Sequence, residues 1–290
     1  MQSSPRPLDP EQALSGESGI VAGRRRRLRA RVADALDDAV LWLRLVPPRL
    51  ARSAGGGTGP VRVVGIYAPD HVASMVRAVG ELRRSRREIT VTLGALGEQA
   101  PELAAETRLS ALHGAGKFEN LNALLAAEPL EGARWLIVID DDVELPHGFL
   151  DRFLFLAERF TLQLAQPALR QTSHAAWRVF RRARGSVARI THMVEIGPLT
   201  AFERSVAAEL LPFPALRMGW GLDSHWAALA RERGWRLGVV DATAIRHESR
   251  ETASAYDREE AIEELRTFLQ DRDHIDRKTA NSVIETHRSW

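Results

Sequence analysis

Three consecutive aspartates, Asp140, Asp141 and Asp142, follow the apolar run from Trp135 to Ile139. Ligands of open α/β sheets bind beyond the carboxyl ends of strands, so these acids stand where chemistry is expected. Side chains alternate along an extended backbone, which points Asp140 and Asp142 one way and Asp141 the other. Neighbouring carboxylates repel, and a divalent cation such as Mg²⁺ or Mn²⁺ removes that penalty. The pattern predicts a site for a cation and a diphosphate; the alternative is a solvated acidic turn.

A second segment suited to ligand binding runs from Met218 to Trp226. Gly219 and Gly221 permit a tight backbone around Trp220, and the face of an aromatic ring packs well against the apolar face of a sugar. Asp223 is expected to open a helix that runs to about Gly234, close to the positive end of the helix dipole. Its alternative role is a helix N-cap.

The acidic triplet resembles the DxD motif of GT-A glycosyltransferases, especially those of family 2. The resemblance implies that a nucleoside diphosphate sugar is the donor and that Mn²⁺ or Mg²⁺ is the cofactor. Asp140 and Asp142 would then hold the metal, and Asp140 and Asp141 would contact the donor. The order of further matches along the chain carries this resemblance.

Upstream, residues 114–122 resemble the family segment G-K-x-x-N-x-N. Lys117 would meet a donor phosphate, and Asn120 would belong to the donor site, or Asn120 or Asn122 would brace the loop. An ordinary helix start is the alternative. At the end of the first strand, Tyr67 would stack on the nucleotide base and Asp70 would accept a hydrogen bond from it, unless Asp70 only caps the next helix.

Downstream, residues 194–202 resemble the strand that floors the sugar pocket, which places Gly197 near the sugar. The Gly-Trp-Gly-x-Asp run is similar to the Gly-Trp-Gly motif of galactosyltransferases and to the Glu-Asp motif of inverting family 2 enzymes. Trp220 and Gly221 would contact sugar or acceptor, and Asp223 would act as the general base. One feature departs from the family, because the usual pair of acids is reduced to Asp223.

The last predicted site residue is His247, which follows the apolar run of residues 237–241. GT-A enzymes often complete the metal site with a histidine after this strand, so the resemblance makes His247 a metal ligand beside Asp140 and Asp142. The alternative is a histidine that packs or lies at the surface.

Elements that position these residues are visible in the apolar pattern. Strands are expected at residues 61–68, 89–93, 135–139 and 237–241, and helices at residues 70–86, 121–127, 150–160, 223–234 and beyond 256. Strands that are apolar on both faces and alternate with helices indicate an α/β fold with a mostly parallel sheet and helices on both faces. With the resemblance, this predicts one Rossmann-like GT-A domain over residues 59–290.

Residues 1–58 are expected to form a separate tail. Residues 1–20 have a disordered composition, and residues 54–60 are a glycine-rich linker. Between them lies a helix with a basic run at Arg24–Arg27, Arg29 and Arg31 and with apolar residues at helical spacing. Those apolar residues are Leu28, Val32, Leu36, Val40 and Leu43.

This helix has two interpretations. It packs on its own domain or on a dimer partner, or it is a peripheral membrane contact through residues 24–46. In the second case the arginines bind anionic lipid, and Trp42 and Leu45 lie at the interface. The aspartates at positions 34, 37 and 38 argue against it, because they would face the same lipid.

Composition narrows the remaining possibilities. The chain has 290 residues, of which 44% are hydrophobic and 27% are charged, which suits a globular protein. The absence of cysteine excludes disulfides and thiolate chemistry. The net charge of +2 indicates no nucleic-acid partner.

Without a secretory signal pattern we expect a cytoplasmic location, with or without membrane contact. The arginines between 178 and 189 either grip an anionic acceptor or are solvated.

Together these observations predict a metal-dependent glycosyltransferase of the hexosyltransferase type, acting with inversion. Its acceptor hydroxyl would belong to a glycan, a lipid-linked molecule or a small molecule. One alternative is a nucleotidyltransferase, although Tyr67 to Asp70 does not supply the basic glycine-rich loop which that chemistry needs. The other is a catalytically silent protein that binds nucleotide sugars.

Overall fold

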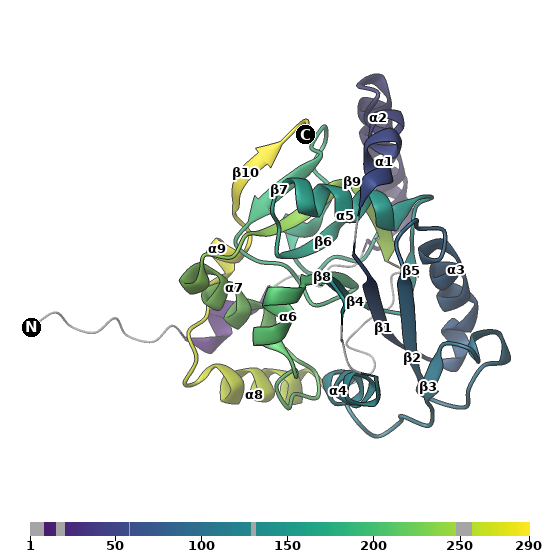
Figure 1. Cartoon of the computed structure of the whole chain (residues 1–290). Coiled ribbons are helices and arrows are strands. Elements are labelled where there is room, and N and C mark those ends of the chain that lie inside the picture. Colours follow the sequence, from purple (N-terminus) through teal and green to yellow (C-terminus); the bar gives the residue numbers. More distant parts are fainter. Residues whose placement is uncertain (1–8, 16–20, 58, 129–131, 248–256) are drawn as a thin grey trace, which may run out of the picture.

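The computed structural model describes residues 9–15, 21–57, 59–128, 132–247 and 257–290 (Figure 1). The strands are β1 (Val61–Tyr67), β2 (Ile89–Ala95), β3 (Thr107–Leu109), β4 (Trp135–Ile139), β5 (Val143–Glu144), β6 (Leu164–Leu169), β7 (Ala188–Thr191), β8 (Leu199–Glu203), β9 (Leu237–His247) and β10 (Val283–His287). The α-helices are α1 (Arg24–Leu43), α2 (Val46–Ser53), α3 (Val72–Leu82), α4 (Lys117–Ala127), α5 (Phe149–Arg159), α6 (Arg204–Leu210), α7 (Leu222–Arg233), α8 (Arg258–Leu269) and α9 (Arg277–Ala280). Short 3-10 helices are η1 (Pro10–Ala13), η2 (Ala54–Gly56), η3 (Pro69–His71), η4 (Pro101–Leu103) and η5 (Arg178–Phe180).

The strands form one mixed sheet in the order β10-β7-β9-β6-β8-β4-β1-β2-β3, and β5 pairs with β9. Neighbours from β4 to β3 are parallel, and β6 is parallel to β9. Because β8 is antiparallel to both β4 and β6, the carboxyl ends of β1, β4, β6 and β9 lie at one edge of the sheet. The predicted α/β fold is confirmed.

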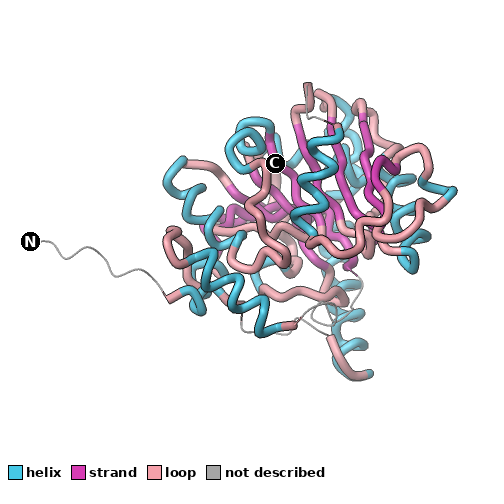
Figure 2. Tube along the Cα trace, turned by 90° about the horizontal axis from the view of Figure 1, so that it is seen from below, coloured by secondary structure: helices cyan, strands magenta, loops and turns pink. Residues whose placement is uncertain are grey.

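Two hydrophobic cores lie on the two faces of this sheet (Figure 2). The β4 strand shows the two-residue period, since Trp135, Ile137 and Ile139 enter one core while Leu136 and Val138 enter the other. Helices α3 and α5 cover the first face, and α4, α6 and α8 cover the second. The strand is therefore buried on both faces, and this packing fixes the position of its last residue, Ile139.

The sheet contains strands that the apolar pattern did not predict, namely β3, β5, β6, β7 and β10. The β6 strand was not predicted, because Pro167 interrupts an otherwise ordinary apolar run. The proline is tolerated because β6 pairs with β8 only at Leu164 and Ala165. The strand expected at residues 194–202 begins only at Leu199, and the preceding residues form a loop against the end of β4.

The amino-terminal segment is more ordered than its composition indicates. In η1, Ala13 is buried in the core that α8 helps to form, and Glu11 pairs with Arg266 of α8. The two prolines after α1 lie in the first turn of α2 rather than only ending a helix. Residues 1–8, 16–20 and 58 of the expected tail lie outside the described residues.

The glycine-rich linker is packed as well. A Cβ atom at Gly57 would lie 2.1 Å from the Arg87 guanidinium, whose two terminal nitrogens bind Glu158 of α5. No helix in the described part of the chain is both long and apolar enough to cross a bilayer.

Candidate active site

The acidic triplet stands directly after β4 at the carboxyl edge of the sheet. The backbone N–H of Asp140 donates to the carbonyl of Pro198 at 2.8 Å, which places loop 194–198 against the acids. Asp141 points away from its neighbours, as alternation predicts. Its carboxylate accepts the N–H of Ala68 at 2.7 Å and lies 2.8 Å from Nδ1 of His71.

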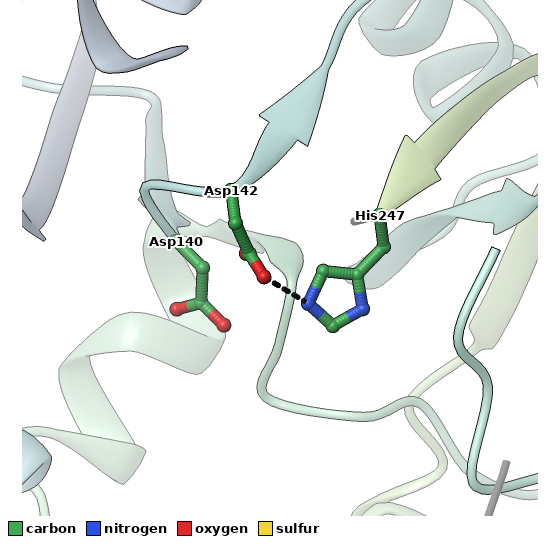
Figure 3. A group of neighbouring side chains, drawn as sticks. All are labelled: Asp140, Asp142 and His247. Carbon is green, nitrogen blue, oxygen red and sulfur yellow. Dashed lines mark ion pairs between the residues drawn. The ribbon is translucent and has the colours of Figure 1, made fainter. Parts of the chain in front are cut away.

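Asp140, Asp142 and His247 converge on the other side of the turn (Figure 3). One ligand atom from each lies within 4.8 Å of the others. His247 arrives there because β9 continues to residue 247 and pairs with Val143 just after the acids. Its Nε2 lies 3.1 Å from Oδ2 of Asp142.

Electrostatics within this group favour the charged forms. Burial alone raises the pKa of Asp142, but the hydrogen bond and charge of His247 outweigh it and hold that pKa below its usual value. Burial likewise lowers the pKa of His247, and Asp142 reverses the shift, so the pKa of His247 is raised.

The donor set fits a divalent cation. Two carboxylates supply oxygen ligands of the kind that Mg²⁺ and Mn²⁺ prefer, and the imidazole supplies a nitrogen once its proton has left. All three side chains come from strand ends that the sheet holds in place. The residues present therefore match a metal site with two acids and one histidine.

Lys117 lies on the flank of this group, at the start of α4. Its Nζ is 2.5 Å from Oδ1 of Asp140, and although burial lowers the pKa of Lys117, the charge of Asp140 raises it overall. Gly197 covers the same pair, since a Cβ there would lie 2.9 Å from Oδ2 of Asp140 and 3.2 Å from the lysine Nζ. Any larger residue at position 197 would crowd the acid.

Asp223 lies in the first turn of α7, next to loop 194–198. Its Oδ1 accepts the backbone N–H of Ile196 at 2.9 Å. Burial raises the pKa of Asp223 to about 7, while that hydrogen bond and Lys117 oppose the shift. Glu195 precedes Ile196 in the loop, and burial followed by the charge of Asp223 raises the pKa of Glu195 well above its usual value. The two acids therefore interact electrostatically.

The loop that carries Trp220 is held from two sides. The carboxylate of Glu264 in α8 accepts the backbone N–H groups of Arg217, Met218 and Gly219 at 2.6, 3.0 and 2.8 Å. Gly219 has φ +78°, and a Cβ there would lie 1.9 Å from the ring of Phe118 in α4. The Trp220 ring is partly buried on the second core, and Gly221, with φ +87°, backs onto the leucines of α8.

Tyr67 is a correction to the sequence-based assignment. Its ring is 1% exposed, and its hydroxyl lies 3.0 Å from Oγ1 of Thr107 and accepts the N–H of Ala100. The ring is a core residue and presents no face to a base. Residue type could not reveal this, because an aromatic residue at a strand end suits a pocket and a core equally.

The structure also locates Asp70 and Asn120. Asp70 lies in η3 with a 58% exposed side chain, while His71 holds the position before α3. Asn120 is buried, and its amide donates to the carbonyls of Leu112 and Ala115, so it braces the loop before α4. Contact of either residue with a donor stays a prediction.

Three site residues were missed by sequence reasoning: Glu195, His71 and His174. Glu195 was passed over because its neighbour Asp223 is distant in sequence. His71 follows the proline turn, and nothing in the sequence pattern connects it with the acids. In the structure it pairs with Asp141 and holds that side chain in place. The His174 ring packs edge-on against His247 at 5.7 Å, and burial together with the charge of His247 lowers the pKa of His174 to about 4.

Comparison with known proteins places the fold. Neither a protein-family model nor a curated protein matches the chain. Among solved structures it is similar to GalNAc-T7 with UDP, GalNAc and Mn²⁺, at 13% identity and a TM-score of 0.50 over 66% of this chain and 43% of that one. It is also similar to residues 1–349 of TarS from S. aureus with UDP-GlcNAc, at 12% identity and a TM-score of 0.51 over 76% and 68%.

A mannosyltransferase from Pyrobaculum calidifontis is matched at a TM-score of 0.44, which is too low to carry an argument. The chain spans less than half the length of the GalNAc-T7 structure. At these identities the likeness concerns the fold, and that fold is the one shared by GT-A glycosyltransferases.

Proposed function

We propose that this chain, which has the GT-A fold, transfers a sugar from a nucleoside diphosphate sugar to an acceptor hydroxyl with the help of a divalent cation. The observation that carries the proposal is the convergence of Asp140, Asp142 and His247 at the carboxyl edge of the sheet. The two similar structures that hold UDP or a UDP-sugar support it, and one of them also holds Mn²⁺.

On the donor side, Asp140, Asp142 and His247 would hold Mn²⁺ or Mg²⁺, which neutralises negative charge on the departing diphosphate. Lys117 adds a fixed positive charge on the flank of the same acids. Gly197 lets loop 194–198 lie against Asp140 and Lys117, because a Cβ at this position would crowd both side chains. Asp141 supports the turn from behind through Ala68 and His71.

On the acceptor side, Asp223 takes the proton from the attacking hydroxyl. A pKa of about 7 suits a general base that works near neutral pH. With the base on one side of the sugar and the leaving diphosphate on the other, the reaction inverts the anomeric centre. Trp220 and Gly221 lie immediately before this residue in sequence and would line the place where sugar and acceptor meet.

The position of Glu195 near Asp223 bears on the alternative that the chain is a catalytically silent protein that binds nucleotide sugars. Sequence analysis finds one acid where inverting enzymes of the resembled family have two. In the structure Glu195, from loop 194–198, is close enough for the charge of Asp223 to raise its pKa. A site that keeps two partly buried acids at a cost in desolvation free energy favours an enzyme over a binding protein.

The deciding experiment incubates the chain with UDP-sugars and GDP-sugars with and without Mn²⁺ and identifies the released nucleotide. We expect nucleoside diphosphate, released only with metal. A parallel incubation with nucleoside triphosphates and a sugar 1-phosphate tests the alternative, because release of pyrophosphate there would identify a nucleotidyltransferase. Binding without turnover in either mixture would identify a silent binding protein.

Metal binding is tested separately by counting free Mn²⁺ with electron paramagnetic resonance. We expect Asp142→Asn to lose Mn²⁺ binding by at least about tenfold. The matched control is Asp141→Asn, an adjacent acid that points to Ala68 and His71 and should keep its Mn²⁺ affinity. Equal loss in both variants would contradict the assignment of the ligands.

A further inference from the structure

Helix α1 has its polarity reversed relative to an ordinary surface helix. Its buried residues are Asp34, Asp37 and Leu41. Its exposed face carries large apolar side chains, namely Leu28 (64% exposed), Val32 (52%), Leu36 (49%), Trp42 (59%) and Leu43 (84%). A surface helix normally buries its apolar side and exposes its charges, so this apolar face requires an explanation.

The acids of α1 are held by the domain itself. Asp34 accepts the backbone N–H groups of Gln171 and Thr172 at 2.7 and 3.1 Å. Asp37 accepts from Arg184 at 2.7 Å. Asp38 accepts from Arg170 and Arg182, both at 2.5 Å. None of the three carboxylates therefore shares the apolar face, which removes the argument that the sequence offered against a membrane contact.

Helix geometry places positive charge on both borders of the apolar face. At about 100° per residue, Leu28, Val32, Leu36 and Leu43 fall within a sector of about 80°. In the same projection Arg25 and Arg29 lie on one side of the sector centre, and Arg24 and Arg31 on the other. All four arginines are exposed. Trp42 and Leu45 extend the apolar face at the far end of the helix.

We propose that this face of α1 binds the surface of an anionic lipid bilayer. Its apolar side chains would enter the boundary between headgroups and acyl chains, and the bordering arginines would bind lipid phosphates. Figure 1 shows α1 at the periphery of the fold, where a flat surface can reach it.

Charge decides against a second copy of the chain as the occupant. Between residues 24 and 45 the acidic residues are Asp34, Asp37 and Asp38, and all three are already bound to arginines or backbone groups of the domain. Two α1 helices packed through their apolar faces would bring arginines together without any acid to compensate them. Lipid phosphates supply the missing negative charge.

The test is co-sedimentation of the full chain with phosphatidylcholine vesicles that contain or lack phosphatidylglycerol. We expect pelleting only with the anionic vesicles, and weaker pelleting as salt rises. The double variant Leu28→Glu/Leu36→Glu should not pellet. Arg25→Gln/Arg29→Gln should lower the partition coefficient by about fivefold for each arginine removed.

The matched control is Val283→Glu/Ile284→Glu, which alters the other exposed apolar pair, on β10, and should pellet like the parent chain. All substituted side chains are exposed, and an unchanged unfolding transition verifies that the fold is intact. Quenching of tryptophan fluorescence by brominated lipid should weaken in Trp42→Phe.

Equal pelleting with neutral and anionic vesicles, or full pelleting of Leu28→Glu/Leu36→Glu, would overturn the proposal. So would a dimer in sedimentation equilibrium that this double variant dissociates, because the second copy would then be the occupant. These readouts use no sugar donor, so their failure would leave the proposed transferase activity intact.

Discussion

At the scale of single residues, burial sets the charge of the proposed acceptor site. Asp223 and Glu195 lie together in a poorly solvated region, and only one of them is assigned a role in proton transfer. Asp223 has the hydrogen bond from Ile196 and the charge of Lys117 to favour its ionised form. For Glu195, burial and the charge of Asp223 raise the pKa well above its usual value, and the charge of Lys117 opposes that shift.

The first prediction concerns the base. Because the pKa of Asp223 is raised to about 7, we expect kcat/KM to rise with pH and to level off above about pH 7. Asp223→Asn should lower turnover by about 10²- to 10⁴-fold and leave donor binding unchanged. Initial rates across pH, with donor affinity from calorimetry, check both statements. Unaltered turnover in this variant would refute the base.

The raised pKa of Asp223 also determines how this residue affects the free energy of unfolding at different pH. An acid whose folded pKa is raised lowers the free energy of unfolding once the pH exceeds its unfolded pKa of about 4. We therefore expect Asp223→Asn to stabilise the fold at pH 8 by about 1–2 kcal/mol, allowing for partial solvation, and to change nothing at pH 3. Urea unfolding at the two pH values provides the comparison.

The second prediction separates Glu195 from Asp223. Because burial and the charge of Asp223 raise the pKa of Glu195 well above its usual value, the neutral form of this side chain is favoured. Glutamine resembles a neutral glutamic acid in shape, so Glu195→Gln should keep turnover within about threefold and keep the rise near pH 7. A loss as large as that of Asp223→Asn would show that Glu195 itself moves the proton.

How far the sequence predicts such residues depends on what brings them together. Asp140 and Asp142 were predicted to lie together because they follow an apolar strand, and His247 was added by the family resemblance; the structure brings the three side chains together. Glu195 was missed because its partner lies on a helix, and that approach is a tertiary fact. Tyr67 was misassigned because residue type does not report burial.

At the scale of elements, α8 positions the loop that carries Trp220. One carboxylate, that of Glu264, accepts three consecutive backbone N–H groups of this loop. Those groups would otherwise lack partners within the helix or sheet ladders. The loop conformation therefore depends on a residue more than forty positions away in sequence.

The third prediction follows. Glu264→Gln keeps one amide oxygen but loses the charge that strengthens these hydrogen bonds, so we expect a loss of about 1–3 kcal/mol in the free energy of unfolding and a higher KM. The control is Glu263→Gln, a neighbour on α8 that forms an exposed ion pair with Arg266, and its effect should stay within about 0.5 kcal/mol. Equal effects would remove the special role of Glu264.

Elements were predicted best where the apolar pattern is strongest. The bounds of β4 agree with the sequence pattern, and α7 ends before Gly234 as expected. The β6 strand was missed because Pro167 argues against a central strand, and only the short pairing with β8 explains its tolerance. Pairing of this kind is a property of the assembled sheet.

At the scale of the whole molecule, several arginines between 178 and 189 form ion pairs within the fold. Sequence analysis offered an anionic acceptor or solvent as the partner of this stretch. Instead Arg182 and Arg184 bind acids of α1, and Arg189 forms a buried pair with Asp241 at 2.9 Å. The segment expected to be a tail is thus joined to the domain by ion pairs.

The fourth prediction tests this junction. Burial raises the pKa of Asp38, but the hydrogen bonds of Arg182 and Arg170 outweigh it, so the pKa of Asp38 lies below its usual value. A lowered acid pKa contributes stability above the unfolded pKa of about 4 and loses it as pH falls through the folded value. Asp38→Asn should cost about 0.5–1 kcal/mol at pH 7, discounted for its 40% exposure, and nothing at pH 2. Calorimetric unfolding measures it, and a pH-independent difference would contradict the ion pairs.

The division of the interior into two cores has a consequence for the candidate active site. Leu222 and Trp226, which flank Asp223 in α7, pack in one core. Ile139, which directly precedes Asp140, packs in the other. A substitution that changes the packing of one core can shift residues of the other core only by moving the strands between them. Under the proposed function, the base Asp223 and the metal ligand Asp140 are therefore positioned by opposite layers of the molecule.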